Sequence, residues 1–196
     1  MNNEQKFHVL PNIRVDTIPR IFENVTEICK ALGFIPKKIC QVGAAADELE
    51  YIEFINNGAK ALLFEPQPEF FKHLKEKYKN NHNISLFEIG IYNRVGKFKF
   101  YERWACTFLS EVNSPPVRSR NINLLERPGY TNDEKDAFYC ECAKFNGFDD
   151  GDIDLFLIDT EGAEWECIEQ MISRPRIMCI ETHYIYSDYK NPHLDE

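Results

Sequence analysis

Small and acidic residues follow the apolar segments of this chain, at the points where strands would end. In open α/β sheets, ligands bind beyond the carboxyl ends of the strands. The residues that follow each apolar segment are therefore the first candidates for a binding or catalytic site. They are Gly43, Glu65 with Pro66, Gly90, Asp159 with Glu161, and Glu181 with His183.

The turn of Gly43 to Ala46 consists of small residues only. Such a turn lets a ligand approach the backbone closely, and it opens a helix whose N-terminus favours negative charge. A tight strand-to-helix turn needs small residues in any case, so the turn is equally consistent with a structural role. The complete G-x-G-x-x-G pattern of dinucleotide-binding proteins is absent.

Glu65 closes the second apolar segment, one helix and one strand after Gly43. A carboxylate at a strand end can accept two hydrogen bonds from a ribose diol. The alternative is a solvated glutamate before a proline turn. The separation from Gly43 favours a nucleoside site.

Asp159, Glu161 and Glu164 come directly after a strongly apolar segment. Carboxylates at a helix N-terminus also stabilise the helix dipole, so Glu161 and Glu164 could be structural. Asp159 stands at the strand end itself and is the better candidate for a catalytic residue.

Glu181 and His183 follow the last apolar segment. A histidine can act as a general base near neutral pH, although a single histidine is more often a packing residue. Asp159, Glu181 and His183 could together bind a divalent metal such as Mg²⁺ or Mn²⁺ if their strands are neighbours.

Apolar periodicity predicts the elements that position these residues. Strands and helices alternate in the first half, which is typical of a parallel sheet flanked by helices. The predicted helices cover 18–32, 47–55 and a segment from Pro68, and the predicted strands cover 37–42, 59–64 and 84–89.

The second half begins with a half-exposed strand at 97–101 and then loses its periodicity. Because long loops in compact domains are usually functional, we interpret 102–137 as a lid over the bound substrate. Strands are predicted at 138–145, 153–158 and 176–180, and a helix at 163–172.

The length of 196 residues favours a single domain, with 1–36 as an N-terminal helical extension. The net charge of -9 argues against nucleic-acid binding. No apolar run approaches the roughly 20 residues of a membrane span, and the polar start lacks a signal peptide, which predicts a cytoplasmic protein. The seven cysteines, including the Cys140 and Cys142 pair, are interpreted as reduced thiols.

Three blocks resemble the FkbM family of S-adenosylmethionine-dependent methyltransferases. ICQVGAAAD is similar to the first family motif, an acidic residue followed by x-G-A-N-x-G, and ALLFEPQPEFFKHLK is similar to the second, in which F-E-P closes a strand. DIDLFLIDTEGAEWECI resembles the block D-x-x-K-x-D-x-E-G-A-E and is the most specific of the three.

The resemblance implies a Rossmann-like class I methyltransferase fold and S-adenosylmethionine as cofactor. It implies that Gly43 and Ala44 lie against the methionine portion and that Glu65 holds the ribose hydroxyls. Gln41 and Pro66 are further expected cofactor contacts. Gly90 and Ile91 would border the adenine, and Asp159 would lie near the transferred methyl group. The family usually adds a strand pair after the position of Glu181. We therefore expect a sheet that is shortened at this edge, or completed by 97–101 or by a partner chain.

The family's acceptors include sugars and other hydroxyl-bearing metabolites. The resemblance thus implies methyl transfer to a hydroxyl of a sugar, glycan or similar small acceptor. Asp159 or His183 would remove the proton, and Glu181 would orient the base. Gln41 stands where the family has an acid, and Asp47 where it has a second glycine, which motivates a catalytically silent binding module as the alternative. A nicotinamide-dependent oxidoreductase is disfavoured by the missing glycine pattern, and a homo-oligomer is left open.

Overall fold

The computed structural model describes residues 8–10, 13–14, 24–46, 48–102, 107–112 and 134–181. The chain divides into two compact units, Met1–Ile35 and Pro36–Glu196. The first unit contains the antiparallel strands β1 (His8–Leu10) and β2 (Ile13–Arg14) and the helix α1 (Val25–Ala31). The side chain of Asn24 caps α1 by accepting a hydrogen bond from the backbone N–H of Glu27.

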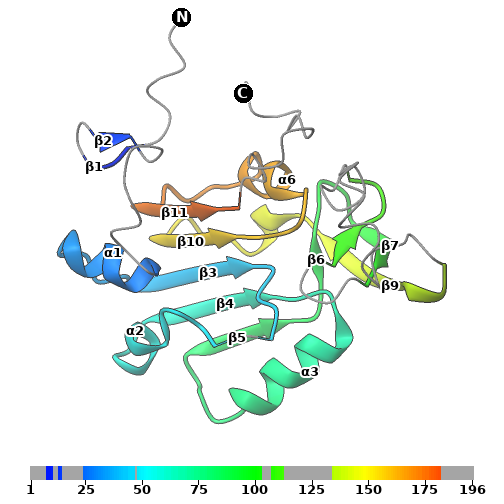
Figure 1. Cartoon of the computed structure of the whole chain (residues 1–196), viewed down its shortest axis with the longest axis horizontal. Helices are drawn as coiled ribbons and strands as arrows, with labels where there is room; N and C mark the ends of the chain where they lie inside the picture. The colour runs from blue at the N-terminus through cyan, green and yellow to red at the C-terminus, as the bar shows by residue number, and fades with distance from the viewer. Residues whose placement is uncertain are drawn as a thin grey trace, which may run out of the picture. The chain divides into compact units, whose positions relative to one another are not determined.

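The second unit is built on a parallel sheet of five strands in the order β11-β10-β3-β4-β5 (Figure 1). All four pairings between neighbouring strands are parallel. The sheet confirms the predicted Rossmann-like α/β fold. Its strands are β3 (Lys38–Val42), β4 (Lys60–Phe64), β5 (Ile84–Phe87), β10 (Leu155–Ile158) and β11 (Ile177–Ile180).

Three helices lie in the connections between these strands: α2 (Ile52–Asn56), α3 (Pro68–Lys77) and α6 (Glu164–Ile168). Helix α3 begins at Pro68, as its sequence predicts, because a proline is well tolerated in the first turn of a helix. Helices α2 and α6 are shorter than the predicted ranges 47–55 and 163–172. The chain before α2 and the chain after α6 are both held by distant carboxylates, described below.

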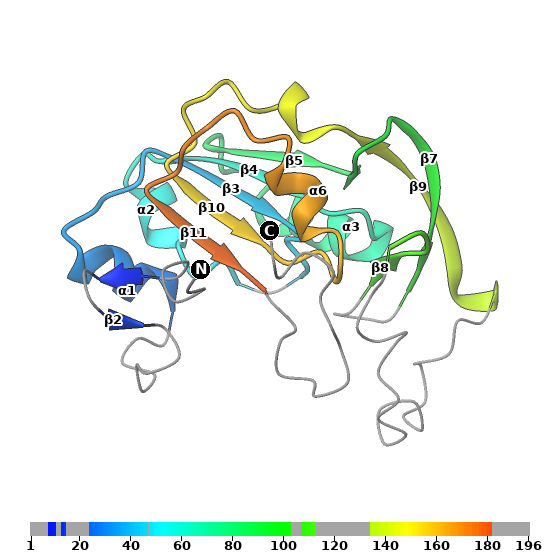
Figure 2. The same cartoon turned by 90° about the horizontal axis from the view of Figure 1, so that it is seen from above.

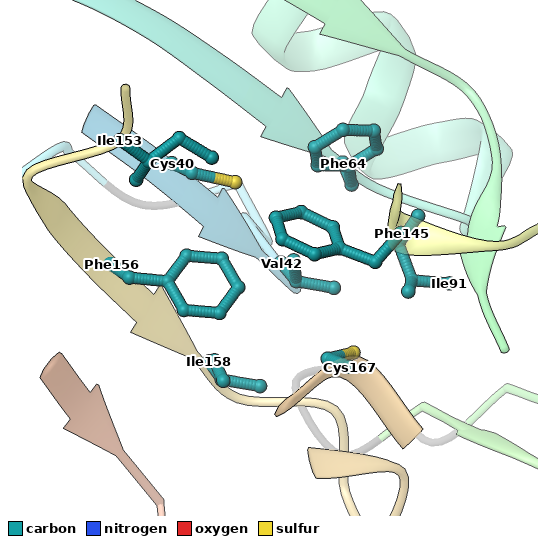
Figure 3. Packing of buried hydrophobic residues seen from close by; sticks show 9 residues of the cluster. All are labelled: Cys40, Val42, Phe64, Ile91, Phe145, Ile153, Phe156, Ile158 and Cys167. Atoms are coloured by element: carbon teal, nitrogen blue, oxygen red, sulfur yellow. The ribbon is translucent and has the colours of Figure 1, made fainter. Parts of the chain in front are cut away.

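Alternate residues of the central strands pack into one apolar cluster (Figure 3). Cys40 and Val42 of β3 and Phe156 and Ile158 of β10 meet Phe145, from the short 3₁₀ helix Phe145–Gly147. Three of the four residues of β10 and three of the five of β3 are buried, which explains why apolar residues follow one another in these strands without strict alternation. The complete cluster consists of Cys40, Val42, Phe64, Ile91, Phe145, Ile153, Phe156, Ile158 and Cys167.

A second sheet has the strand order β6-β9-β7-β8. It lies beyond the carboxyl ends of the parallel strands (Figures 1 and 2). Its strands are β6 (Gly90–Ile91), β7 (Gly96–Tyr101), β8 (Phe108–Leu109) and β9 (Ala137–Ala143), and the 3₁₀ helix Glu134–Asp136 precedes β9. β7 pairs antiparallel with β8 and β9, whereas β6 pairs parallel with β9.

The second sheet changes two expectations from the sequence. The strand at 97–101 does not complete the edge of the parallel sheet, because β7 pairs with β9 and β8 instead. Within the described ranges, β11 is the outermost strand on its side. The segment 102–137, predicted as a lid, contributes the buried strand β8 to this sheet, while 103–106 and 113–133 lie outside the described residues.

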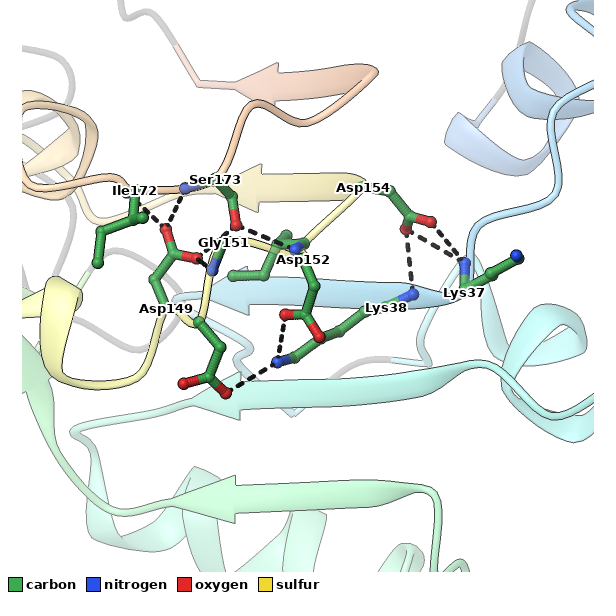
Figure 4. Close-up of polar contacts among 10 residues, drawn as sticks. Lys37, Lys38, Asp149, Gly151, Asp152, Asp154, Ile172 and Ser173 are labelled. Atoms are coloured by element: carbon green, nitrogen blue, oxygen red, sulfur yellow. Dashed lines mark hydrogen bonds and ion pairs between the residues drawn. The ribbon is translucent and has the colours of Figure 1, made fainter.

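The amino ends of β3 and β10 are held by aspartates from the loop before β10 (Figure 4). The carboxylate of Asp154 accepts hydrogen bonds from the backbone N–H groups of Lys37 and Lys38. The buried carboxylate of Asp149 accepts from the backbone of Gly151, Ile172 and Ser173 and from the Ser173 hydroxyl. These bonds fix the loop before β10 and hold Ile172 and Ser173 in the chain that follows α6.

Two further features concern the whole described chain. Six cysteines fall in the described ranges, and all are free thiols, five of them buried. Cys140 and Cys142 are both buried on β9, in agreement with the interpretation as core residues. Among the described helices, none has the length and apolar character needed to cross a membrane.

Candidate functional site

A cleft of about 600 Å³ opens at the carboxyl ends of β3, β4 and β10. The cleft brings together six of the residues predicted from the sequence: Gly43, Glu65, Pro66, Gly90, Ile91 and Asp159. Its other lining residues are Val42, Ala45, Phe64, Gln67, Phe70, Ile89, Phe100, Thr107, Leu109, Thr160, Glu161 and Ala163.

Gly43 forms the turn between β3 and the cleft. It adopts a φ of 79°, and a Cβ atom at this position would lie 1.7 Å from the backbone oxygen of Asp159. Only glycine fits, because the ends of β3 and β10 touch through their backbones here. The missing side chain also leaves the cleft open at this point.

Glu65 lies at the end of β4 and is only 4% exposed. Its Oε2 accepts a hydrogen bond of 2.7 Å from the backbone N–H of Ala45, and its Oε1 one of 2.8 Å from that of Gln67. Burial raises the pKa of Glu65 to about 7, against the effect of these two bonds, and the charge of Asp159 contributes to the rise. The two N–H groups fix the carboxylate at the cleft wall, and Ala45 adopts a φ of 49° to reach it.

The segment Asp159-Thr160-Glu161-Gly162 turns sharply after β10. Glu161 adopts a φ of 55°, which is uncommon for a residue other than glycine. Glu164 stabilises the turn, because its Oε1 accepts from the backbone and hydroxyl of Thr160 and from the backbone of Gly162. Glu164 therefore has the structural role considered for it, whereas Glu161 lines the cleft.

Three carboxylates meet at the mouth of this turn. Oxygen atoms of Asp159, Glu161 and Glu181 all lie within 4.8 Å of one another. Burial, the hydrogen bond to Asp159 and the charges of the neighbouring acids together raise the pKa of Glu181 to about 9. Such a set of oxygens could share a proton, or could hold a hard cation such as Mg²⁺. Asp159 and Glu181 were predicted to meet, but His183 lies outside the described residues.

Gln41 and Ala44 do not line the cleft. The Gln41 side chain accepts a hydrogen bond of 2.5 Å from the buried hydroxyl of Tyr51 and donates one of 3.3 Å to the backbone oxygen of Gly43. Ala44 is buried, and its N–H donates to the backbone oxygen of Phe64. Both residues thus stabilise the glycine turn from within the protein. Asp47 lies outside the described residues.

The second sheet forms a wall of the cleft. Gly90 and Ile91 are buried in β6, and a Cβ atom on Gly90 would lie 2.7 Å from the ring of Phe100. Sequence reasoning missed Phe100, Thr107 and Gln67, because the pairing of β7 with β9 that brings the second sheet here is non-local. Only Gln67 carried a local signal, since it directly follows the F-E-P motif.

The arrangement suits a ligand that combines a diol with a positively charged group. A fixed carboxylate at Glu65 can accept hydroxyl hydrogen bonds, and the acidic trio of Asp159, Glu161 and Glu181 attracts positive charge.

The family model of the methyltransferase FkbM domain matches residues 41–196, which include every described residue of the cleft. No curated protein and no solved structure matches the chain. Because the matched region covers most of the chain, this protein belongs to the FkbM methyltransferase family.

Proposed function

We propose that this protein is an S-adenosylmethionine-dependent O-methyltransferase that acts on a hydroxyl of a sugar, glycan or similar small acceptor. The observation that carries the proposal is the shared cleft of Glu65 and Asp159, which end strands on either side of β3. This places a diol-binding carboxylate and a candidate base at opposite sides of the Gly43 turn.

The cleft residues fit S-adenosylmethionine in chemical terms. Glu65 would hold the ribose hydroxyls, while Gly43, which has no side chain, would admit the methionine portion. Gly90 and Ile91 would border the adenine. When bound, the cofactor supplies an electrophilic methyl group on a positively charged sulfur.

Asp159 is the residue to which we assign the acceptor's proton. Its carboxylate is exposed at the cleft, where an incoming hydroxyl can reach it. Glu181 is hydrogen-bonded to Asp159 and held protonated by its surroundings, so it orients the base without competing for the proton. Positioning of the acceptor and exclusion of water supply most of the remaining acceleration. His183 stays a predicted base in the segment after β11.

The same carboxylates are oxygen ligands of the kind that Mg²⁺ and Mn²⁺ prefer. A bound cation would lower the pKa of the acceptor hydroxyl and would replace Asp159 as the agent of its activation. Methyl transfer is therefore measured with EDTA and with added Mg²⁺ or Mn²⁺. Activity that persists in EDTA would support proton removal by a side chain, Asp159 or His183, whereas activity that requires the cation would support a metal held by the three carboxylates.

The direct test is the variant Asp159→Ala in a screen of sugars and glycans with labelled S-adenosylmethionine. We expect methyl transfer to fall at least about 100-fold, because general-base catalysis contributes on that order. Calorimetry should still detect cofactor binding. Asp150→Ala, an exposed aspartate at the opposite end of the sheet, serves as the control and should keep full activity. Full activity of Asp159→Ala would refute the assignment.

A catalytically silent cofactor-binding module is the second candidate. Gln41 favours it, because a neutral amide that is already bonded to Tyr51 stands where the family has an acid. Measurable binding of S-adenosylmethionine without methyl transfer to any acceptor would support this alternative. No binding at millimolar concentration would contradict both candidates.

A further inference from the structure

Gln67 is a buried amide in the wall of the cleft that the proposed function leaves unused. The residue is 2% exposed, lines the cleft, and lies two positions after Glu65. It stands at the N-cap position of α3, but its side chain makes no capping hydrogen bond. The side chain therefore does not serve as a helix cap.

Two of the polar groups of Gln67 are already engaged. Its backbone N–H donates to Oε1 of Glu65 at 2.8 Å, and its side-chain oxygen accepts from the hydroxyl of Thr107 at 2.9 Å. Across the described ranges, no residue accepts a hydrogen bond from its side-chain Nε2. The Nε2 group is therefore an N–H donor in the cleft wall without an acceptor among the described residues, and a hydrogen-bond acceptor on a ligand could satisfy it.

We propose that the Nε2 group of Gln67 donates a hydrogen bond to the nucleoside half of the bound cofactor, and that Thr107 orients the amide for this purpose. The inference rests on the proposed function. It makes Gln67 a specificity-determining residue and Thr107 a positioning residue. It also makes the second sheet, which leads into Thr107 through β8, a part of the cofactor site.

The residues around Gln67 indicate that its amide contacts the nucleoside half of the cofactor. The amide adjoins Glu65, the carboxylate suited to the ribose diol, and its own backbone holds that carboxylate in place. The residues suited to methyl transfer, Asp159 and Glu161, follow a different strand, β10. A hydrogen-bond acceptor on the base or the sugar is therefore the group that Gln67 meets.

Calorimetric titration with S-adenosylhomocysteine, the demethylated form of the cofactor, tests the role of the donor without an activity assay. Gln67→Met keeps the approximate length of the side chain and removes both polar groups, and we expect it to weaken binding about tenfold. Thr107→Val removes the orienting hydroxyl and should weaken binding about threefold, whereas Thr107→Ser retains a hydroxyl and should bind as the wild type does. If Gln67→Met does not fold, the pair at Thr107 decides the outcome.

Analogues of S-adenosylhomocysteine identify the acceptor atom. Each lacks one ring nitrogen, replaced by a C–H group, or one ribose hydroxyl. One analogue should bind the wild type as weakly as it binds Gln67→Met, because the partner of the amide is then missing. Equal affinity of wild type and Gln67→Met for the parent ligand would overturn the inference. An equal loss across all analogues would also overturn it, since this would indicate packing alone.

The same titrations separate this inference from the proposed function. If the wild type binds S-adenosylhomocysteine and the variants bind it equally well, only the role of Gln67 fails. If the wild type itself does not bind, the cofactor assignment fails and the inference fails with it.

Discussion

Carboxylates lie at both ends of the parallel sheet, and their pKa values are shifted in opposite directions at the two ends. At the amino end, Asp149 and Asp154 are surrounded by N–H and hydroxyl donors. Burial by itself would raise the pKa of Asp149, but the hydrogen bonds from Ser173, Gly151 and Ile172 lower it below its usual value. At the carboxyl end, burial and neighbouring acids raise the pKa of both Glu65 and Glu181.

A structural carboxylate and a candidate functional one differ here in the number of hydrogen-bond donors that surround them, although their exposed fractions are alike. Asp149 and Glu65 are both less than 5% exposed. Asp149 receives four hydrogen bonds from three residues, whereas Glu65 receives two and also faces the charge of Asp159. Groups whose pKa is shifted toward neutrality in a cleft are typical of functional sites.

The largest loss of stability is expected from Gly43→Ala, which disrupts the contact between β3 and β10 at their carboxyl ends. A Cβ atom would collide with the backbone oxygen of Asp159, so we expect a loss of about 5 kcal/mol or more in the free energy of unfolding. Cofactor binding should be undetectable by calorimetry. Gly147→Ala is the matched control, because a Cβ there meets nothing within 4 Å. Urea denaturation measures both, and a mild effect at Gly43 would contradict the contact between the two strand ends.

Asp149→Asn disrupts the hydrogen bonds at the amino ends of the parallel strands. The new amide NH₂ would face backbone donors, which leaves buried N–H groups without acceptors and should cost about 4 kcal/mol of unfolding free energy. The folded protein should bind S-adenosylmethionine with unchanged affinity, because the cleft lies at the other end of the sheet. Asp152→Asn, which alters only an exposed ion pair with Lys38, should change stability by less than about 0.5 kcal/mol. A change in cofactor affinity for Asp149→Asn would show that the two ends are coupled.

The variant Glu65→Gln tests whether Glu65 and Asp149 make stability depend on pH in opposite directions. The folded protein holds a proton on Glu65 up to about pH 7, whereas the unfolded chain releases it near pH 4.5. The unfolding free energy of the wild type, relative to Glu65→Gln, should therefore fall by about 3 kcal/mol as the pH rises from 4.5 to 7. Asp149 has the opposite sign, because its stabilisation is present above pH 4 and is lost as the pH falls below 3.8. Denaturant titrations between pH 3 and 8 measure both trends, and parallel trends would contradict the assignment.

Local sequence patterns predicted much of the central sheet. The bounds of β3 and β4 agree with the predicted strands to within one residue, because most residues of these two parallel strands are apolar and buried. The helix after Gly43 begins later than predicted, since the backbone of Ala45 is held by Glu65, 20 residues away. The pattern around the turn could not contain this information.

Only part of the candidate site could be predicted, because some of its residues are brought together by contacts between distant segments. Strand-end position identified Glu65, Asp159 and Glu181, because a parallel sheet brings strand ends to one edge. Glu161 resembled a helix cap in sequence, and only its φ of 55° turns it into the cleft wall. Gln67 and Thr107 meet across 40 positions through the second sheet, which no local pattern encodes.

The raised pKa values of Glu65 and Glu181 also affect the net charge of the folded protein at neutral pH. The formal value of -9 treats all 32 acidic residues as ionised. With pKa values of about 9 for Glu181 and about 7 for Glu65, folding at neutral pH takes up protons and leaves the native protein less negative than its composition states. A cation held by Asp159, Glu161 and Glu181 would displace the proton of Glu181 into the solvent. The heat of such binding would then depend on the ionisation enthalpy of the buffer, so proton release would measure the occupancy of this site.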